Sequence, residues 1–257
     1  MSTPNTPPAT PHNAATLVLV PGLMCDHTVW ADVLAHLGSA AQHALVPDHG
    51  ECDDLVGMAQ QILDATTGPL AVVGHSMGGR VALEMVRLAP QRVHHLALMD
   101  TGHLARATGP EGEQEAAKRQ ALLDLARTQG VAAMARTWAQ GMVHPERLRD
   151  SALMDAIVAM FACKTPHHFA CQIRALLSRP NASRTLQHIA GPVHLVCGAQ
   201  DTWSPVSQHQ DMAKLLSQPV LHVIADAGHM APMEKPEAVA QVLLAWLAAE
   251  PLTPAAA

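Results

Sequence analysis

The chain has 257 residues, a length at which a single domain can bury a large core. Its formal net charge is -6 at pH 7 and its sparse lysines are scattered among acidic residues, so nucleic acid is not expected as a partner. Hydrophobic residues make up 49% of the chain, yet no uninterrupted run approaches the roughly 18 apolar residues of a membrane span.

The first 14 residues are rich in Pro, Thr, Asn and Ala and contain neither the basic nor the apolar segment of a signal peptide. They predict a disordered tail over 1–14 and a cytoplasmic protein. The 17 histidines include no HExxH pattern, so no metal site is expected. An odd number of cysteines without a CxxC pair predicts free, mostly buried thiols. The cysteines are Cys25, Cys52, Cys163, Cys171 and Cys197.

Short apolar runs bounded by turn residues alternate with helical patterns along the chain. Because the runs are continuous rather than alternating, they are typical of parallel strands buried on both faces. The candidate strands are 16–20, 43–46, 70–74, 95–99, 193–197 and 220–224. Apolar residues at three- and four-residue spacing predict helices over 29–37, 55–65 and 77–89. This alternation predicts an α/β fold with a mostly parallel sheet of about six strands and helices on both faces.

Between 103 and 188 the strand pattern disappears and helical periodicity replaces it. The apolar positions that carry this periodicity are Met134, Trp138, Met142, Met154, Met160, Phe161, Phe169 and Leu176. We expect residues 103–188 to form a helical cap inserted into a core made of 15–102 and 189–250. A last amphipathic helix over 236–249 precedes a C-terminal tail at 251–257.

The strongest local motif lies in residues 70–80, which read LAVVGHSMGGR. A buried-type strand runs here into G-x-S-x-G and then into a helix, the context that a nucleophilic serine requires. Ser76 is expected on a strained turn, where Gly74 and Gly78 leave room for the backbone to fold back. The helix N-terminus then favours negative charge beside Ser76.

A serine hydroxyl needs a base, and the base benefits from a carboxylate. His229 follows the last candidate strand and Asp201 follows the strand before it, so both are expected beside Ser76 in the chain order Ser, Asp, His. Asp201 also suits a helix N-cap. Asp100 ends another strand and is an alternative acid, whereas Asp226 is interpreted as a turn residue.

Acyl transfer also needs N–H donors for the oxyanion that develops on the substrate carbonyl. The amide after the nucleophile, that of Met77, suits one position. The bend at Pro21 and Gly22 after the first strand can aim the Leu23 amide at the same point, and an ordinary strand-ending turn is the alternative. The substrate-binding candidates are Met24, His75, Trp138, Met142 and Met230.

Five segments together resemble the α/β-hydrolase superfamily, and within it the small bacterial serine esterases similar to pimeloyl-acyl-carrier-protein methyl ester carboxylesterase. They are PGLMCD at 21–26, GHSMGG at 74–79, ALMDT at 97–101, GAQD at 198–201 and AGHMAPME at 227–234. The resemblance covers about residues 16–249 and implies a Ser76-His229-Asp201 triad with an oxyanion hole from the Leu23 and Met77 amides. Two features depart from many relatives: Pro21 replaces a histidine before Gly22, and no hairpin precedes the first parallel strand.

These features predict a cofactor-independent carboxylesterase that acts on a small-molecule ester, as a monomer or homodimer. The cap shows no motif for the acyl group. Its Met, Trp and Phe residues would suit small or medium apolar groups, while Arg80, Arg136 or Arg174 would suit a carboxylate. The same triad also fits an enol-lactonase, a thioesterase or a carbon–carbon bond hydrolase, and the fold alone fits a non-catalytic binding scaffold.

Overall fold

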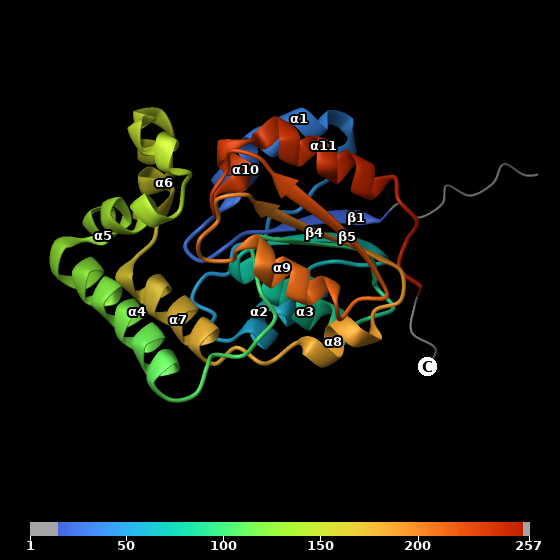
Figure 1. The fold of residues 1–257 in the computed structure, drawn as a ribbon, viewed down its shortest axis with the longest axis horizontal. Coiled ribbons are helices and arrows are strands. Elements are labelled where there is room, and N and C mark those ends of the chain that lie inside the picture. The colour runs from blue at the N-terminus through green and yellow to red at the C-terminus, as the bar shows by residue number, and fades with distance from the viewer. Residues whose placement is uncertain (1–14, 254–257) are drawn as a thin grey trace, which may run out of the picture.

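In the computed structural model, which describes residues 15–253, five strands form one parallel sheet in the order β1-β2-β3-β4-β5 (Figure 1). The strands are β1 (Thr16–Val20), β2 (Leu70–His75), β3 (Val93–Met99), β4 (Pro192–Gly198) and β5 (Gln218–Ile224). Because every pairing is parallel, all five carboxyl ends lie at the same edge of the sheet. The predicted α/β fold with a mostly parallel sheet is confirmed, and the tail residues 1–14 and 254–257 lie outside the described residues.

The sixth candidate strand, 43–46, contributes a single bridge instead of a ladder. The bridge joins Leu45 to Val18. The Leu45 amide donates to the Leu17 carbonyl at 2.8 Å, and the Leu19 amide donates to the Leu45 carbonyl at 2.9 Å. Pro47 has no N–H, so the pairing does not extend beyond this point. The segment therefore lies beside β1, on the side away from β2, as a sixth position without strand length.

Helices cover both faces of the sheet. On one face α1 (Ala31–Leu37) and α11 (Pro236–Leu247) pack together. The opposite face carries α2 (Leu55–Asp64), α3 (Met77–Leu88), α8 (Ser183–His188) and α9 (Val206–Ala213) (Figure 1). Single-turn and 3-10 segments occur at His27–Trp30, Gly38–Ala41, Ala139–Gly141, Pro145–Arg149 and α10 (Ala231–Glu234). Within residues 15–253, every helix is too short or insufficiently apolar to span a bilayer.

Between β3 and β4, four helices precede α8: α4 (Pro110–Gln129), α5 (Val131–Trp138), α6 (Ser151–Ala162) and α7 (Pro166–Leu177). In Figure 1 they lie, green to yellow, on the side toward which β4 and β5 point. The Asp150 side chain caps α6 by accepting from the Leu153 amide at 3.1 Å, and Thr165 and His168 form a capping box at α7. The division of the chain into core and inserted cap stays a prediction.

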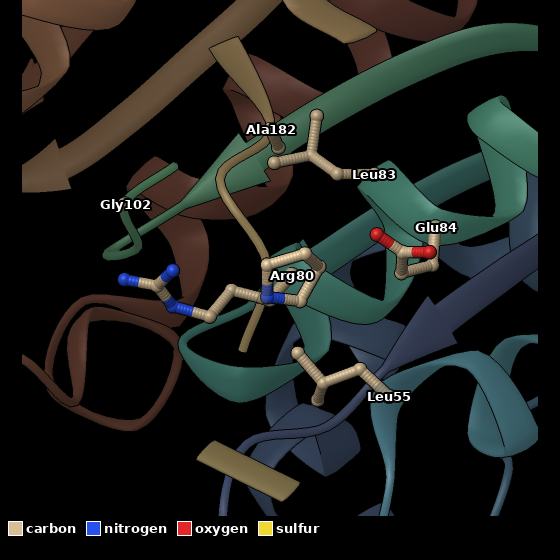
Figure 2. A pocket seen from close by; sticks show the side chains of 7 residues that line it. Leu55, Arg80, Leu83, Glu84, Gly102 and Ala182 are labelled. Atoms are coloured by element: carbon tan, nitrogen blue, oxygen red, sulfur yellow. The ribbon is translucent and has the colours of Figure 1, made fainter. Parts of the chain in front are cut away.

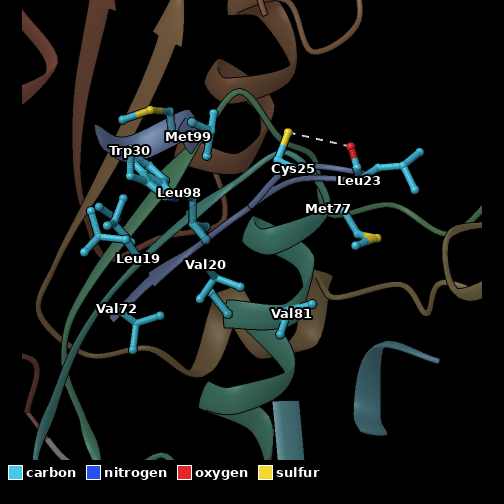
Figure 3. Packing of buried hydrophobic residues seen from close by; sticks show 14 of the residues in the cluster. Leu19, Val20, Leu23, Cys25, Trp30, Val72, Met77, Val81, Leu98 and Met99 are labelled. Carbon is cyan, nitrogen blue, oxygen red and sulfur yellow. Dashed lines mark hydrogen bonds between the residues drawn. The ribbon is translucent and has the colours of Figure 1, made fainter. Parts of the chain in front are cut away.

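Apolar side chains of β1, β2 and β3 pack between the sheet and α3 (Figure 3). Val20, Val72, Val81 and Leu98 are each 0% exposed, and burial of one such side chain stabilises the fold by roughly 1.5–3 kcal/mol. This packing fixes the carboxyl ends of β1 and β2. The loops that leave these two ends carry Leu23 and Ser76.

Candidate functional site

Ser76 lies on the sharp turn between β2 and α3. Its backbone has φ 55° and ψ -117°, a conformation that L-residues rarely adopt. A Cβ on Gly74 would collide with the Gly78 carbonyl, and a Cβ on Gly78 would collide with the carbonyl oxygens of Val20 and Pro21. The turn that exposes the Ser76 side chain therefore requires both glycines, as the motif predicted.

Substitution of Gly78 by alanine tests this packing. Since the colliding atoms belong to the backbone, the start of α3 must move away from β1. We therefore expect the free energy of unfolding to fall by about 2 kcal/mol or more. Urea denaturation of the two proteins measures the change. Gly38→Ala is the control, because Gly38 has open space around it, so only the backbone penalty of its positive φ, about 1 kcal/mol, should appear there. Equal losses in both variants would contradict the packing argument.

A continuous hydrogen-bond chain joins the three predicted catalytic residues. His229 Nε2 lies 2.8 Å from Ser76 Oγ, and His229 Nδ1 lies 2.8 Å from Asp201 Oδ2. With Asp201 ionised, Nδ1–H donates to the carboxylate and Nε2 accepts from the serine hydroxyl. Asp201 and His229 are 4% and 5% exposed, so the hydrogen bond between them is largely shielded from water. The structure thus brings together three loops that follow β2, β4 and β5.

The surroundings of Asp201 favour its ionised form. Burial alone would raise the pKa of Asp201, but the His229 ring and the amides of Ser204 and Trp203 outweigh it and lower the pKa to about 2. These amides donate to Asp201 Oδ1 at 3.0 and 2.8 Å. The carboxylate is therefore charged at neutral pH. Asp201 can cap the turn that follows it and contact His229 at the same time, because Oδ1 accepts from the two amides and Oδ2 faces the histidine.

The other two carboxylates considered from the sequence have different surroundings. Asp226 has positive φ and a side chain that is 72% exposed, and it faces Lys235 Nζ at 3.6 Å, as a turn residue would. Asp100 is 0% exposed at the end of β3. Among residues 15–253, neither Asp100 nor Asp226 hydrogen-bonds to the His229 ring.

The two predicted oxyanion amides remain free to donate. Among residues 15–253, neither the Leu23 nor the Met77 N–H donates to a protein acceptor. The Gly22 carbonyl accepts from the Cys25 amide at 3.1 Å, which turns the N–H of the same peptide, that of Leu23, the opposite way. Figure 3 shows Leu23 after β1 and Met77 at the start of α3.

Two buried side chains hold this loop and carried no signal in the sequence. Gln172 of α7 accepts from the Met24 amide through Oε1 at 2.8 Å, and Met24 has φ 64°. His49 Nε2 donates to the Pro21 carbonyl at 3.0 Å. Gln172 lies 148 residues from Met24 in the chain, so no local pattern marks the contact.

The His229 loop is held from the region between α5 and α6. The Met142 carbonyl accepts from the His229 and Met230 amides at 2.6 and 3.2 Å. Glu234, only 3% exposed, accepts from the Gly228 amide at 2.8 Å and from the His144 amide at 2.7 Å. One carboxylate therefore joins the histidine loop to the segment before α6. Glu234 lies within the AGHMAPME segment at 227–234, whose pattern predicted no role for it.

Substitution of Glu234 by glutamine should loosen this connection. Its amide nitrogen cannot accept, so one of two buried N–H groups loses its partner, and we expect a loss of about 1–3 kcal/mol in the free energy of unfolding. Because the His229 loop depends on the same contact, kcat should fall as well. Urea denaturation and steady-state kinetics measure the two effects. Glu237→Gln, at an exposed position of α11, is the matched control and should change neither.

The chain has four Trp and two Phe, and four of these six side chains form a group beside His229. The Trp203 ring centre lies 5.0 Å from that of His229 and stacks on Trp138 at 5.6 Å. Trp138 lies 5.4 Å from both Phe161 and Phe169. Trp203 was not a sequence candidate, although it lies two residues after Asp201.

The predicted substrate-binding residues divide into two groups. Trp138 is half-buried and belongs to the aromatic group beside His229. Met24, His75, Met142 and Met230 are buried. His75 Nε2 donates to the His229 carbonyl at 2.7 Å, and Met142 acts through its carbonyl as described above. Contact between any of these side chains and a substrate stays a prediction.

Two cavities lie elsewhere in the described residues. One, of about 10 Å³, is the pocket around Arg80 in Figure 2 and has room for no more than about one water. The other, of about 320 Å³, is lined by Val93 at the start of β3 and by residues of α8. Neither is lined by Ser76, Asp201 or His229, so neither is the place where Ser76 would meet a substrate.

Comparisons with known proteins agree with the fold. A model described as the alpha/beta hydrolase family matches residues 17–242. The chain is 31% identical over 258 residues to the dihydrolipoyllysine-residue acetyltransferase component of an acetoin cleaving system from Pseudomonas putida, covering 90% of this chain and 63% of that protein. The chain thus spans less than two thirds of that relative.

Two further similarities involve esterases. The chain is 26% identical over 236 residues to a pimeloyl-[acyl-carrier protein] methyl ester esterase from Nitrosomonas europaea, covering 88% of this chain and 92% of that protein. A thermophilic esterase from Thermogutta terrifontis superposes with a TM-score of 0.78 at 24% identity, covering 91% of this chain and 89% of that one. The latter similarity supports the fold.

Proposed function

Because the chain belongs to the alpha/beta hydrolase family, we propose that it is a serine carboxylesterase that acts on small to medium, largely apolar esters. The observation that carries the proposal is the hydrogen-bond chain from Ser76 through His229 to Asp201, with 2.8 Å at each step. A base hydrogen-bonded to a part-exposed serine, and itself oriented by a buried acid, is the arrangement that activates a hydroxyl as a nucleophile.

In the proposed reaction, Ser76 Oγ attacks the ester carbonyl while its proton moves to His229 Nε2. The carbonyl oxygen becomes an oxyanion, which the Leu23 and Met77 amides stabilise. The bond to the alcohol oxygen then breaks as His229 returns the proton to it, leaving an acyl-Ser76. A water that gives its proton to His229 attacks this acyl group, and His229 protonates Oγ as the acid leaves. The reaction needs no metal or organic cofactor.

The proposed preference for neutral, apolar esters rests on two observations. An aromatic group that includes Trp138 and Trp203 lies next to His229. The three arginines considered as carboxylate ligands have other partners: Arg80 donates to the Leu104 carbonyl at 2.8 Å, Arg136 lies 3.8 Å from Asp155, and Arg174 lies 3.1 Å from Asp53. The cytoplasmic location and the monomeric or homodimeric state stay predictions.

The test is a hydrolysis screen of the purified protein over p-nitrophenyl esters of graded acyl length, lactones and thioesters. We expect turnover of short and medium p-nitrophenyl esters and a stoichiometric covalent adduct with a fluorophosphonate. Turnover of lactones or thioesters alone would replace the carboxylesterase assignment with one of the alternative hydrolases. A wild-type protein that neither turns over nor reacts with the fluorophosphonate would instead favour a binding scaffold.

A further inference from the structure

Asp100 lies in direct contact with the proposed triad acid and has no role in the mechanism above. It directly follows β3, is 0% exposed and has φ 46°. Its Oδ1 accepts from the Gly198 amide at 2.8 Å, while its Oδ2 is buried without a donor among residues 15–253. The carbonyl of the same Gly198 accepts from the Asp201 amide at 3.2 Å, so the two aspartates lie at one turn with their carboxyl groups within hydrogen-bonding reach. Two carboxylates in such contact cannot both be ionised without a nearby cation.

The histidines around Asp100 do not supply that cation. His75 Nε2 lies 3.9 Å from Asp100 Oδ2, but it donates to the His229 carbonyl at 2.7 Å. Burial and the neighbouring His229 lower the pKa of His75 to about 3, so the ring is neutral. His209 accepts from the Thr101 amide through Nε2 at 3.3 Å and donates through Nδ1 to the Pro205 carbonyl at 3.2 Å, which is a neutral tautomer.

The remaining titratable neighbours add negative charge or none. Burial, together with Asp100 and Asp201, raises the pKa of Cys197 to about 12, so the thiol keeps its proton. Glu234 is a third buried acid on this side of the sheet. His229 is committed to Asp201 at 2.8 Å. A proton on one of the two aspartates is the remaining way to relieve their repulsion, and Asp201 is the one held ionised by three donors.

We propose that Asp100 is a protonated, neutral carboxylic acid whose Oδ2–H donates a hydrogen bond to the Asp201 carboxylate, so that Asp100 positions the triad acid. This donation satisfies the otherwise unpartnered Oδ2. It also gives Asp201 a further donor besides the Trp203 and Ser204 amides and His229, which fixes its orientation toward His229 Nδ1. The positioning role rests on the proposed function; the protonation does not.

The proton has a consequence for stability that does not involve substrate. Burial, and then the charge of Asp201, raise the pKa of Asp100 well above its ordinary value. A group with a raised folded-state pKa stabilises the fold below its unfolded pKa of about 3.9, and that contribution is lost as pH rises toward the folded pKa. Wild type should therefore lose stability with rising pH through Asp100, and a variant without a titrating group there should not.

Asp100→Asn is the decisive variant, since its amide nitrogen can donate to Asp201 while its oxygen still accepts from Gly198. Urea denaturation of both proteins is measured from pH 4 upward. We expect the unfolding constant of wild type to rise relative to Asp100→Asn by about tenfold per pH unit until the folded pKa is reached. Parallel curves, with no growing difference, would show that Asp100 is ionised and overturn the proposal.

The kinetic arm compares Asp100→Asn with Asp100→Ala on one p-nitrophenyl ester. Because Asn retains the donor, its kcat should stay within about threefold of wild type, whereas Ala should lower kcat by about 10- to 100-fold with little change in KM. Equal losses in both variants would mean that the negative charge of Asp100 matters, against the proposal. If wild type shows no turnover or labelling, the proposed function fails, while the denaturation series still decides the protonation.

Discussion

Replacing Ser76 by alanine is expected to lower kcat for p-nitrophenyl ester hydrolysis by about 10⁶-fold and to abolish the fluorophosphonate adduct. Alanine has no oxygen to form the acyl intermediate, and His229 loses the hydroxyl that lies 2.8 Å from its Nε2. A small residual rate over the uncatalysed reaction should survive, because the Leu23 and Met77 amides can still stabilise an oxyanion formed by water. Binding groups remain in place, so KM should change little.

The matched control is Ser207→Ala, because Ser207 is exposed on α9 and contributes nothing to the hydrogen-bond chain. That protein should keep wild-type turnover and labelling. Treatment of the Ser76→Ala protein with the fluorophosphonate before its assay inactivates any contaminating serine esterase. A Ser76→Ala protein that turns over substrate at the wild-type rate, or that is labelled at another residue, would remove Ser76 as the nucleophile.

The sheet was predictable because each buried parallel strand leaves a short continuous apolar run. Thr16–Val20 was located to the residue, while β3 begins at Val93, two residues before the predicted start. His94 and His95 interrupt the apolar pattern there, although backbone pairing with β2 does not depend on side-chain polarity. At 43–46 the apolar pattern predicted a strand, but an adjacent proline limited the pairing to one bridge.

The candidate site was predictable where chemistry depends on a local motif. Ser76 stands between two glycines that the turn requires, and Asp201 and His229 follow the last two strands. Side chains that hold these loops were not predictable. Gln172 and Glu234 each accept from amides more than 80 residues away, at separations of 148 and 90, and a glutamine or glutamate on a helix has no sequence feature that distinguishes this use.

The protonation proposed for Asp100 could not be predicted from the sequence either. From sequence it was an alternative triad acid, because it ends a strand as Asp201 does. The fold places β3 and β4 side by side, so both strand ends deliver a carboxyl group to the same buried position. The loops decide which acid contacts His229, because they set which amides each carboxyl group accepts from. Asp100 accepts from the Gly198 amide, whereas Asp201 accepts from the Trp203 and Ser204 amides.

Replacing Asp201 by asparagine is expected to lower kcat by about 10⁴-fold with little change in KM. The asparagine can keep its oxygen on the Trp203 and Ser204 amides, which places its NH₂ group against His229 Nδ1, where Oδ2 now lies at 2.8 Å. That group donates, so Nδ1 must accept, and the proton moves to Nε2, which then cannot take the Ser76 proton. Steady-state kinetics on one p-nitrophenyl ester measure the loss. Asp226→Asn, at an exposed turn beside the same histidine loop, is the control and should retain full activity. If Asp100→Asn were the inactive protein and Asp201→Asn the active one, the triad acid would be Asp100.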